Sequence, residues 1–249
     1  MPIGVGKRTP RPTVVCSAHF IKQCVGKQHP TEFCMLETLQ NLDLTPFILS
    51  FKLAGITTLI LFVVALPLAW YLSQTTSKAK PFLEAITALP IVLPPSVLGF
   101  YILIAFTPFD LAFSFWGLVI ASCFYSLPFM VQPLQGGFET LNKNMIEASY
   151  ISGKSKLTTL LRVALPNIKP ALLTALIITF AHTVGEFGVV LMIGGSIPDE
   201  TKVASIAIYE MVEVMDYGSA HIYSGIMLLI SFMVLLGVYT FNRQSRIKI

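Results

Sequence analysis

Two titratable residues, His182 and Glu186, stand in a long apolar run and are placed for proton chemistry. Residues four apart on a helix lie one turn apart on the same face. A carboxylate inside a membrane is costly and is usually paired. Three roles are therefore open for Glu186: a structural ion pair or helix cap, a gate residue, or part of a proton relay with His182. For His182 itself, side-chain packing is the predicted role.

No motif for hydrolytic or nucleotide chemistry accompanies this pair. The sequence contains no G-x-x-x-x-G-K-S/T phosphate loop, no H-E-x-x-H and no G-x-S-x-G. We therefore predict that the chain is not an enzyme and that it has no catalytic residue and no cofactor of its own. Cys16, Cys24 and Cys34 are spaced too widely for a tight zinc motif, so no metal site is predicted.

A second group of candidates lies in a polar segment, residues 138–167, between two apolar runs. The residues of this segment whose types and spacing form a recognisable pattern are Glu147, Ala148, Ser149, Gly153, Leu165 and Pro166. The segment predicts two short helices hinged at Gly153, the first over about 143–152. Gly153 permits a left-handed turn or a close backbone approach.

The second short helix of the polar segment has one apolar face. Leu157, Leu160, Leu161 and Ala164 follow the i, i+3, i+4, i+7 pattern of an amphipathic helix. Ser155 is its expected N-cap, and Pro166 is expected to end it. The spacing alone also fits a helix that lies on a membrane surface without a partner.

The elements that must position these residues are transmembrane helices. Hydrophobic residues make up 54% of the chain and charged residues 12%. A helix that crosses about 30 Å of hydrocarbon needs about 20 mostly apolar residues. Five segments qualify: 47–72, 82–106, 111–134, 168–193 and 221–241. The prediction is an all-α integral membrane protein with five or six transmembrane helices. The uncertain one is the charged, amphipathic stretch 201–216, which fits either an external or re-entrant helix or a sixth span.

The charges between the spans orient them, because Lys and Arg in short loops stay in the cytoplasm. The basic loops contain Lys78 and Lys80, then Lys143, Lys154, Lys156, Arg162 and Lys169, then Arg243, Arg246 and Lys248. The opposite loops contain Asp110, Asp199, Glu200, Glu210, Glu213 and Asp216, against Lys202. This pattern predicts that the mature N-terminus lies outside and that the polar segment and the C-terminus are cytoplasmic.

Residues 1–34 do not fit this orientation, because they carry five basic residues and one acidic residue on the outer side. We interpret them as a wrongly assigned start or a disordered arm, with Met35 as a natural start. Removing them changes the net charge from +4 to zero. The basic pI therefore does not indicate a nucleic-acid partner, and the predicted transmembrane domain is 35–249.

Two interruptions of the spans are candidate pathway sites. Pro94, Pro95 and Ser96 lie in a proline-rich run, which fits either a kinked helix packed against its neighbours or a pathway helix broken in the membrane. Gly185 and Gly188 flank Glu186 and permit a break or close helix contact. Glu186 follows Lys169 by 17 residues, about 25 Å of helix, so it is expected near the outer boundary.

The Glu-Ala-Ser, Gly153 and Leu165-Pro166 pattern resembles the coupling loop of bacterial ABC importer permeases. This resemblance implies a type I ABC importer transmembrane domain in the bacterial inner membrane. It also implies a homodimer, an ABC ATPase subunit that binds ATP and Mg, and a periplasmic or lipid-anchored substrate-binding protein. Glu147 would anchor the loop in a groove of the ATPase.

The proline run and Gly-Glu-Phe-Gly resemble permeases for tetrahedral oxyanions, with molybdate favoured. Sulfate, thiosulfate and tungstate permeases are the alternatives within this family. Asp199-Glu200-Thr201 departs from the family pattern and puts two acidic residues beside the expected anion path. The alternative outside the family is a proton-coupled secondary transporter that uses Glu186 and His182.

Overall fold

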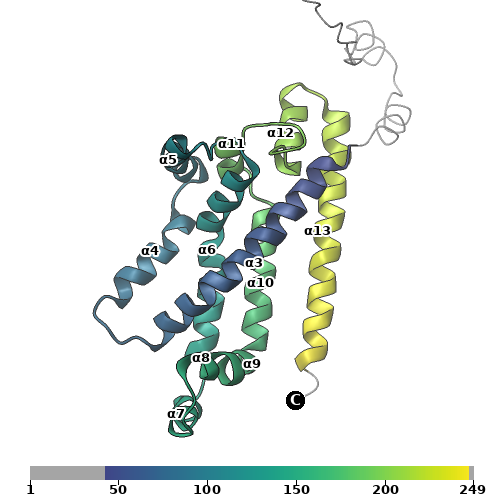
Figure 1. The fold of residues 1–249 in the computed structure, drawn as a ribbon. Coiled ribbons are helices and arrows are strands. Elements are labelled where there is room, and N and C mark those ends of the chain that lie inside the picture. Colours follow the sequence, from purple (N-terminus) through teal and green to yellow (C-terminus); the bar gives the residue numbers. More distant parts are fainter. Residues whose placement is uncertain (1–42, 247–249) are drawn as a thin grey trace, which may run out of the picture. The chain divides into compact units, whose positions relative to one another are not determined.

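The computed structural model describes residues 43–246, and it is helical (Figure 1). The helices are α3 Thr45–Gln74, α4 Lys80–Val92, α5 Pro95–Phe106, the 3₁₀ turn η1 Thr107–Phe109, α6 Phe115–Glu139, α7 Lys143–Ile151, α8 Lys156–Thr159, the π-helical turn η2 Leu160–Ala164, α9 Leu165–Asn167, α10 Lys169–Val184, α11 Gly188–Gly194, α12 Ala204–Glu213 and α13 Tyr217–Arg246. The prediction of an all-α fold is confirmed for this part of the chain. The predicted extension 1–34 and Met35 lie outside the described residues.

Three described helices are long and apolar enough to cross a membrane by themselves: α3, α6 and the part of α13 up to Gly237. Two further pairs of helices pass the same test only if each bent pair is counted as one span, which gives up to five. The count of five predicted spans therefore agrees with the upper figure. α12 has 10 residues, about 15 Å of helix, which is too short for a sixth span.

The centre of the described bundle is formed by α3, α6 and α10, which pack side by side (Figure 1). Two apolar clusters fill it. One contains Leu61, Met130 and Phe138, in the C-terminal halves of α3 and α6. The other contains Leu118 and Ile193 and joins α6 to α11. Because lipid tails are as apolar as these side chains, close van der Waals packing between them is the main force that holds the helices together in a membrane.

The second predicted span, 82–106, is divided into two helices, α4 and α5, which is the broken-helix alternative for its proline-rich run. α4 and α5 meet at a bend of 108°. The cause is local, because a residue that precedes proline is pushed out of the helical region. Leu93 precedes Pro94, which precedes Pro95, and both Leu93 (ψ 134°) and Pro94 (ψ 135°) are extended. The proline-rich run therefore forms a break and not a gentle kink.

The fourth predicted span is also divided. α10 ends at Val184, and after a short non-helical stretch α11 begins at Gly188. At its other end α10 follows α9 across a bend of 86°, and Pro170 occupies its first turn, where a missing N–H costs nothing. The chain thus provides two interrupted helices, one near Pro94 and one near Glu186.

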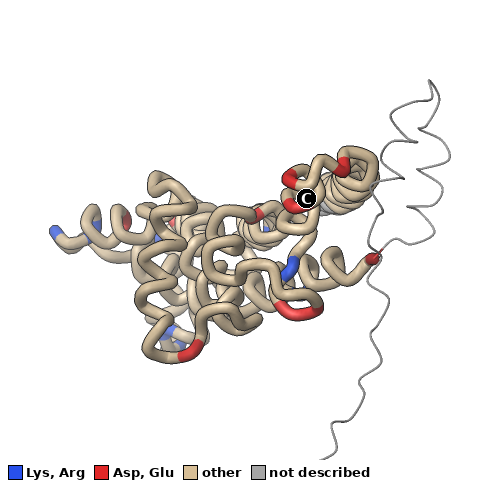
Figure 2. The backbone as a smooth tube through the Cα atoms, turned by 90° about the horizontal axis from the view of Figure 1, so that it is seen from above, with Lys and Arg blue, Asp and Glu red and all other residues tan. Residues whose placement is uncertain are grey.

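The elements with basic residues gather at one end of the bundle. The α3–α4 connection, α7–α9 and the C-terminal end of α13 lie at this end, called here the α7 end (Figure 1). α5, α11 and α12 lie at the opposite end, called the α12 end. Few charged residues interrupt the rest of the described chain (Figure 2). This arrangement agrees with the loop pairing predicted from charge.

Candidate functional site

The two helix breaks meet in space. A Cβ placed on Gly188 would lie 2.7 Å from Pro95 Cβ, so a side chain at this position would push α5 and α11 apart. Beside this contact lies a cavity of about 620 Å³. Its lining comprises Pro95, Ser96, Tyr125, Ala181, His182, Gly185, Glu186, Phe187 and Gly188.

The cavity brings together most of the residues predicted to lie on a path or gate. Pro95 and Ser96 come from one break, and Gly185, Glu186 and Gly188 come from the other. Pro94 is not part of the lining and is the residue that precedes α5. Residues about 90 positions apart in the chain thus share one cavity.

Glu186 is buried, with a relative exposure of 4%. The Ser122 hydroxyl is its polar neighbour, but neither carboxylate oxygen makes a hydrogen bond of ordinary geometry with a described residue, and no ion pair there includes it. The interpretation as an ion pair or helix cap is therefore wrong for this part of the chain. The backbone is fixed instead, because Ser205 Oγ donates to the Glu186 carbonyl at 2.8 Å.

His182 packs in the cavity wall, as predicted. Its ring stacks on Phe129 with centroids 3.9 Å apart, and Nδ1 lies 3.0 Å from Ser126 Oγ. Ser126 Oγ is also 3.0 Å from the hydroxyl of Thr183, which donates to the Thr179 carbonyl. If each hydroxyl donates once, Ser126 donates to Thr183 and accepts from His182, so Nδ1 carries a proton. Nε2 is then the nitrogen left free to accept.

Asp199 and Glu200, which depart from the family pattern, are both exposed and are not part of the cavity lining. Thr201 beside them is buried and donates to the Gly194 carbonyl at 2.6 Å. Asp199 and Glu200 therefore place no carboxylate in the cavity. Among the residues described, no group of three or more His, Cys, Asp or Glu could hold a metal ion.

The polar segment folds as two short helices joined at Gly153. After α7, Gly153 adopts φ +74°, and its N–H donates to the Tyr150 carbonyl. The next N–H, of Lys154, donates to the Ser149 carbonyl. This pair of bonds is a Schellman motif, which favours glycine at the left-handed position. Of the two roles open for Gly153, the left-handed turn is confirmed, because nothing approaches within 4 Å of a Cβ placed there.

Glu147 and Ala148 lie on the exposed side of α7, whereas Ser149 is buried. Ser149 Oγ lies 2.9 Å from Thr159 Oγ1 and ties α7 to α8. Ser155 is the N-cap of α8, as predicted, and accepts from the Thr158 N–H. The exposed surface of the segment is partly apolar, since Ile151 is 87% exposed.

The second half of the polar segment is less regular than predicted. Leu160 and Ala164 are buried, whereas Leu157 and Leu161 are exposed, so the described chain covers only half of the predicted apolar face. The π-helical turn η2 changes the periodicity at this point. Leu165 begins α9 and Pro166 lies within it, and the chain turns one residue after Asn167.

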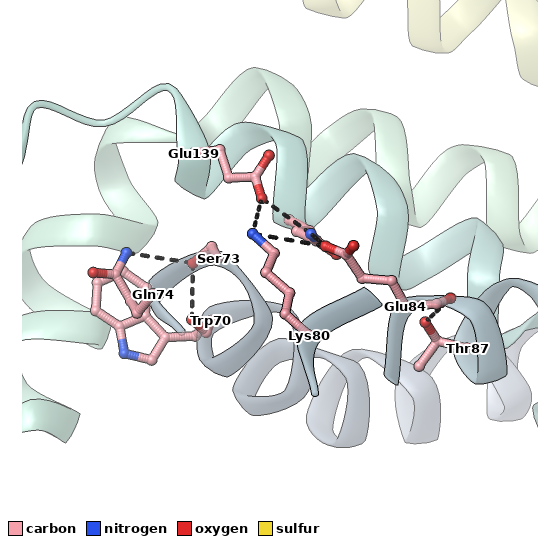
Figure 3. Close-up of polar contacts among 8 residues, drawn as sticks. Trp70, Ser73, Gln74, Lys80, Glu84, Thr87 and Glu139 are labelled. Atoms are coloured by element: carbon pink, nitrogen blue, oxygen red, sulfur yellow. Dashed lines mark hydrogen bonds and ion pairs between the residues drawn. The ribbon is translucent and has the colours of Figure 1, made fainter. Parts of the chain in front are cut away.

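Sequence reasoning missed a polar cluster at the α7 end (Figure 3). Lys80 Nζ lies 3.1 Å from Glu139 Oε1 and 3.7 Å from Glu84 Oε1. Gln135 Nε2 donates to Glu84 at 2.6 Å and to Glu139 at 3.0 Å. Two of the contacts, Lys80–Glu139 and Gln135–Glu84, join residues more than 50 positions apart, and no local spacing indicates them. The other two are i,i+4 pairs.

Comparison with known sequences gives consistent results. The profile of the family described as "Binding-protein-dependent transport system inner membrane component" matches residues 62–247. The "Molybdenum transport system permease protein ModB" of Azotobacter vinelandii is 44% identical over 218 residues, 82% of this chain and 96% of the relative. The "Probable sulfate transport system permease protein cysT" of Marchantia polymorpha is 30% identical and covers 84% of this chain and 77% of its own length.

Solved structures share the fold at low sequence identity. A chain of a bacterial ABC transporter that imports the acidic polysaccharide alginate aligns with a TM-score of 0.71 at 15% identity, covering 93% of this chain and 90% of its own. A chain of the MetNI methionine ABC transporter, in an inward-facing form, aligns with a TM-score of 0.69 at 16% identity, covering 84% and 98%.

Proposed function

Because the chain belongs to the family of binding-protein-dependent transport system inner membrane components, we propose that it imports molybdate as the transmembrane subunit of an ABC transporter. Its fold is that of a type I ABC importer transmembrane domain. The observation that carries the substrate proposal is the 44% identity to a molybdenum transport permease over most of both chains. Sulfate is the second candidate, supported by the sulfate permeases that are about 30% identical.

The polar segment acts as the coupling loop of the importer in this proposal. Exposed Glu147 and Ala148, together with the exposed apolar side chains of Ile151 and Leu157, give a surface suited to a groove on an ATPase subunit. Buried Ser149 and the Gly153 turn hold this surface in shape, while Leu165 and Pro166 lead the chain back toward α10. The ATPase, and not this chain, binds ATP and Mg and hydrolyses the nucleotide.

The cavity at the two helix breaks lies on the translocation path or its gate. A buried carboxylate without a partner costs stability, and residues that break the ordinary rules of burial tend to be functional. Glu186, with Gly185 and Gly188 on one side and Pro94, Pro95 and Ser96 on the other, fits this expectation. We propose that two copies of the chain form one pathway between them and that each copy binds one ATPase.

We further propose that the α7 end faces the cytoplasm, where ATP is available, and that the α12 end faces outward. A periplasmic or lipid-anchored binding protein then delivers the oxyanion at the α12 end. Closure of the ATPases pushes the coupling loops together and switches the pathway between its inward-facing and outward-facing states.

Uptake by the reconstituted importer tests this function. The chain is placed in vesicles with its ATPase and binding protein, and ATP-dependent uptake of labelled molybdate is measured with labelled sulfate as the comparison. We expect molybdate uptake that requires ATP and is abolished by Glu147→Arg, which removes the anchor and reverses its charge. Lys143→Gln, at another exposed position of α7, is the control. Preference for sulfate would reassign the substrate, and uptake driven by a proton gradient without the ATPase would overturn the proposal.

A further inference from the structure

The polar cluster of Lys80, Glu84, Gln135 and Glu139 joins two elements that the proposed function uses (Figure 3). Lys80 and Glu84 lie in the first turns of α4. Glu139 is the last residue of α6 and comes directly before the connection to α7. One lysine, two carboxylates and an amide thus connect the start of α4 to the point where the chain enters the polar segment.

The end of α6 is held from a second side. The ring of Trp70, near the end of α3, meets Phe138 edge-on, with centroids 5.1 Å apart. Phe138 is buried and directly precedes Glu139 in the chain. If the polar segment shifts and moves the end of α6, both the contact of Phe138 with α3 and the contacts of Glu139 with α4 must change.

α4 is only partly covered by the other described helices. It packs along α6 and places Leu83 against the apolar cluster between α3 and α6, yet none of its residues is fully buried. Its far half borders an apolar cavity of about 400 Å³, between Ile86 and Leu89 on one side and α5 and Phe124 on the other. Elements with little buried surface move at low cost, so α4 can swing while its start stays attached.

The far end of α4 leads to the site with Glu186. α4 has 13 residues, about 20 Å of helix, and it ends at the break before Pro95. Pro95 is the residue that touches Gly188 and lines the cavity. A swing of α4 about its start would therefore displace the contact on which the cavity depends.

We propose that the cluster of Lys80, Glu84, Gln135 and Glu139 is a clamp through which movement of the polar segment reaches the cavity, with α4 as the lever. The inference rests on the proposed function, because it assigns these residues a part in coupling ATP hydrolysis to transport. They are positioning residues and do not touch the transported oxyanion.

The test measures how much labelled molybdate enters per ATP hydrolysed by the reconstituted importer. Lys80→Glu puts three carboxylates together and breaks the clamp, so we expect this ratio to fall about two- to fivefold, the range for a partly exposed ion pair. Exchange of the charges in Lys80→Glu/Glu139→Lys restores the pair and should restore the ratio. Lys78→Gln is the matched control, because Lys78 is exposed two residues away and forms no ion pair with any residue the structure describes.

A purely structural role would reduce the amount of assembled importer and lower both rates together, leaving the ratio unchanged. An unchanged ratio in Lys80→Glu, or a ratio that the charge exchange does not restore, would therefore overturn the clamp. The proposed function and the clamp are refuted by different results. Absence of ATP-dependent molybdate uptake in the wild-type importer would refute the function, whereas the variants of Lys80 test the clamp.

A second readout does not depend on the substrate. Ser96→Cys, in a chain whose four native cysteines are replaced, reports on the cavity through its rate of maleimide labelling. We expect ATP trapped in the ATPase subunits to change the labelling rate of Ser96→Cys when Lys80 is present and to leave this rate unchanged when Lys80→Glu is added. An equal response to ATP in both would also overturn the clamp.

Discussion

Ser149 shows how one hydroxyl can determine the shape of a docking surface. The family pattern treats this position as a small residue, but here the buried Ser149 Oγ pairs with Thr159 Oγ1. Ser149→Ala leaves the Thr159 hydroxyl buried without this partner, so we expect the free energy of unfolding to fall by about 1–3 kcal/mol. Ser149→Ala/Thr159→Val, which removes both groups, should recover most of the loss. Denaturant titration of the purified chain in detergent measures both.

The control for this pair is Ser152→Ala, whose exposed hydroxyl donates to the Ala148 carbonyl of the same helix. We expect a change within about 0.5 kcal/mol, as for most surface substitutions. If the double variant is less stable than Ser149→Ala alone, the pair does not act as a unit and the argument for Ser149 fails.

Glu186 is the residue at which stability and function are expected to diverge. Glu186→Gln keeps the size of the side chain and removes a carboxyl group that has no partner in the described structure. We expect the unfolding free energy to stay the same or rise, while molybdate uptake falls about tenfold, or about 1.4 kcal/mol in the rate. Glu213→Gln removes an exposed carboxylate on α12 and serves as the control. Normal uptake by Glu186→Gln would exclude Glu186 from the path.

At the scale of whole elements, local sequence signals predicted where helices break or turn but not how the flanking helices are then arranged. Consecutive prolines at 94 and 95 force an extended backbone whatever the surroundings, and Gly153 marks its turn for a similarly local reason. The 108° bend depends on what α4 and α5 pack against, which spacing does not reveal. The expected place of Glu186 was counted along one continuous helix, whereas α10 ends at Val184 and α11 begins only at Gly188.

Contacts between distant elements were the least predictable part of the site. The meeting of Pro95 with Gly188 and of Lys80 with Glu139 depends on how three helices pack. Helical periodicity also did not reveal the π-helical turn at Leu160–Ala164 or which apolar side chains beside it are buried. The residue types in the cavity were predictable, but their common location was a property of the fold.

The segment around α12 is fixed by an ion pair whose strength depends on pH. Burial opposes ionisation of Glu210, but the hydrogen bond of Lys202, the nearby Ser196 hydroxyl and the positive charge of Lys202 together outweigh it and hold the pKa of Glu210 below its ordinary value of 4.5. A lowered folded pKa means that the pair stabilises the fold fully above the unfolded pKa. This stabilisation is lost as the pH falls through the folded pKa.

Unfolding of Lys202→Met at several pH values tests this dependence. We expect it to be less stable than wild type by about 0.2–1 kcal/mol at pH 7, and the difference should shrink as the pH falls below 4.5. In Glu210→Gln the same substitution of Lys202 should have no such pH dependence. A difference that grows toward acidic pH would show that another group is responsible.

For the molecule as a whole, charge and fold agree on two chemically different ends. The elements with the basic loops gather at the α7 end, and α12 and the acidic loops lie at the other (Figure 1). Because basic loops resist translocation, the α7 end should be cytoplasmic. This orientation is also the one in which the polar segment meets an ATPase in the compartment that contains ATP.

Cysteine labelling in intact cells tests the orientation. In a chain whose native cysteines are replaced, we expect a membrane-impermeant maleimide to label Glu200→Cys from outside and to label Lys156→Cys only after the membrane is opened. Both positions are exposed in the structure, so burial within the chain cannot account for a difference in labelling. The reverse pattern would place the polar segment outside and remove it from any ATPase. It would refute the coupling role of Glu147 and the clamp at Lys80 together, since both depend on ATP-driven movement at this end of the bundle.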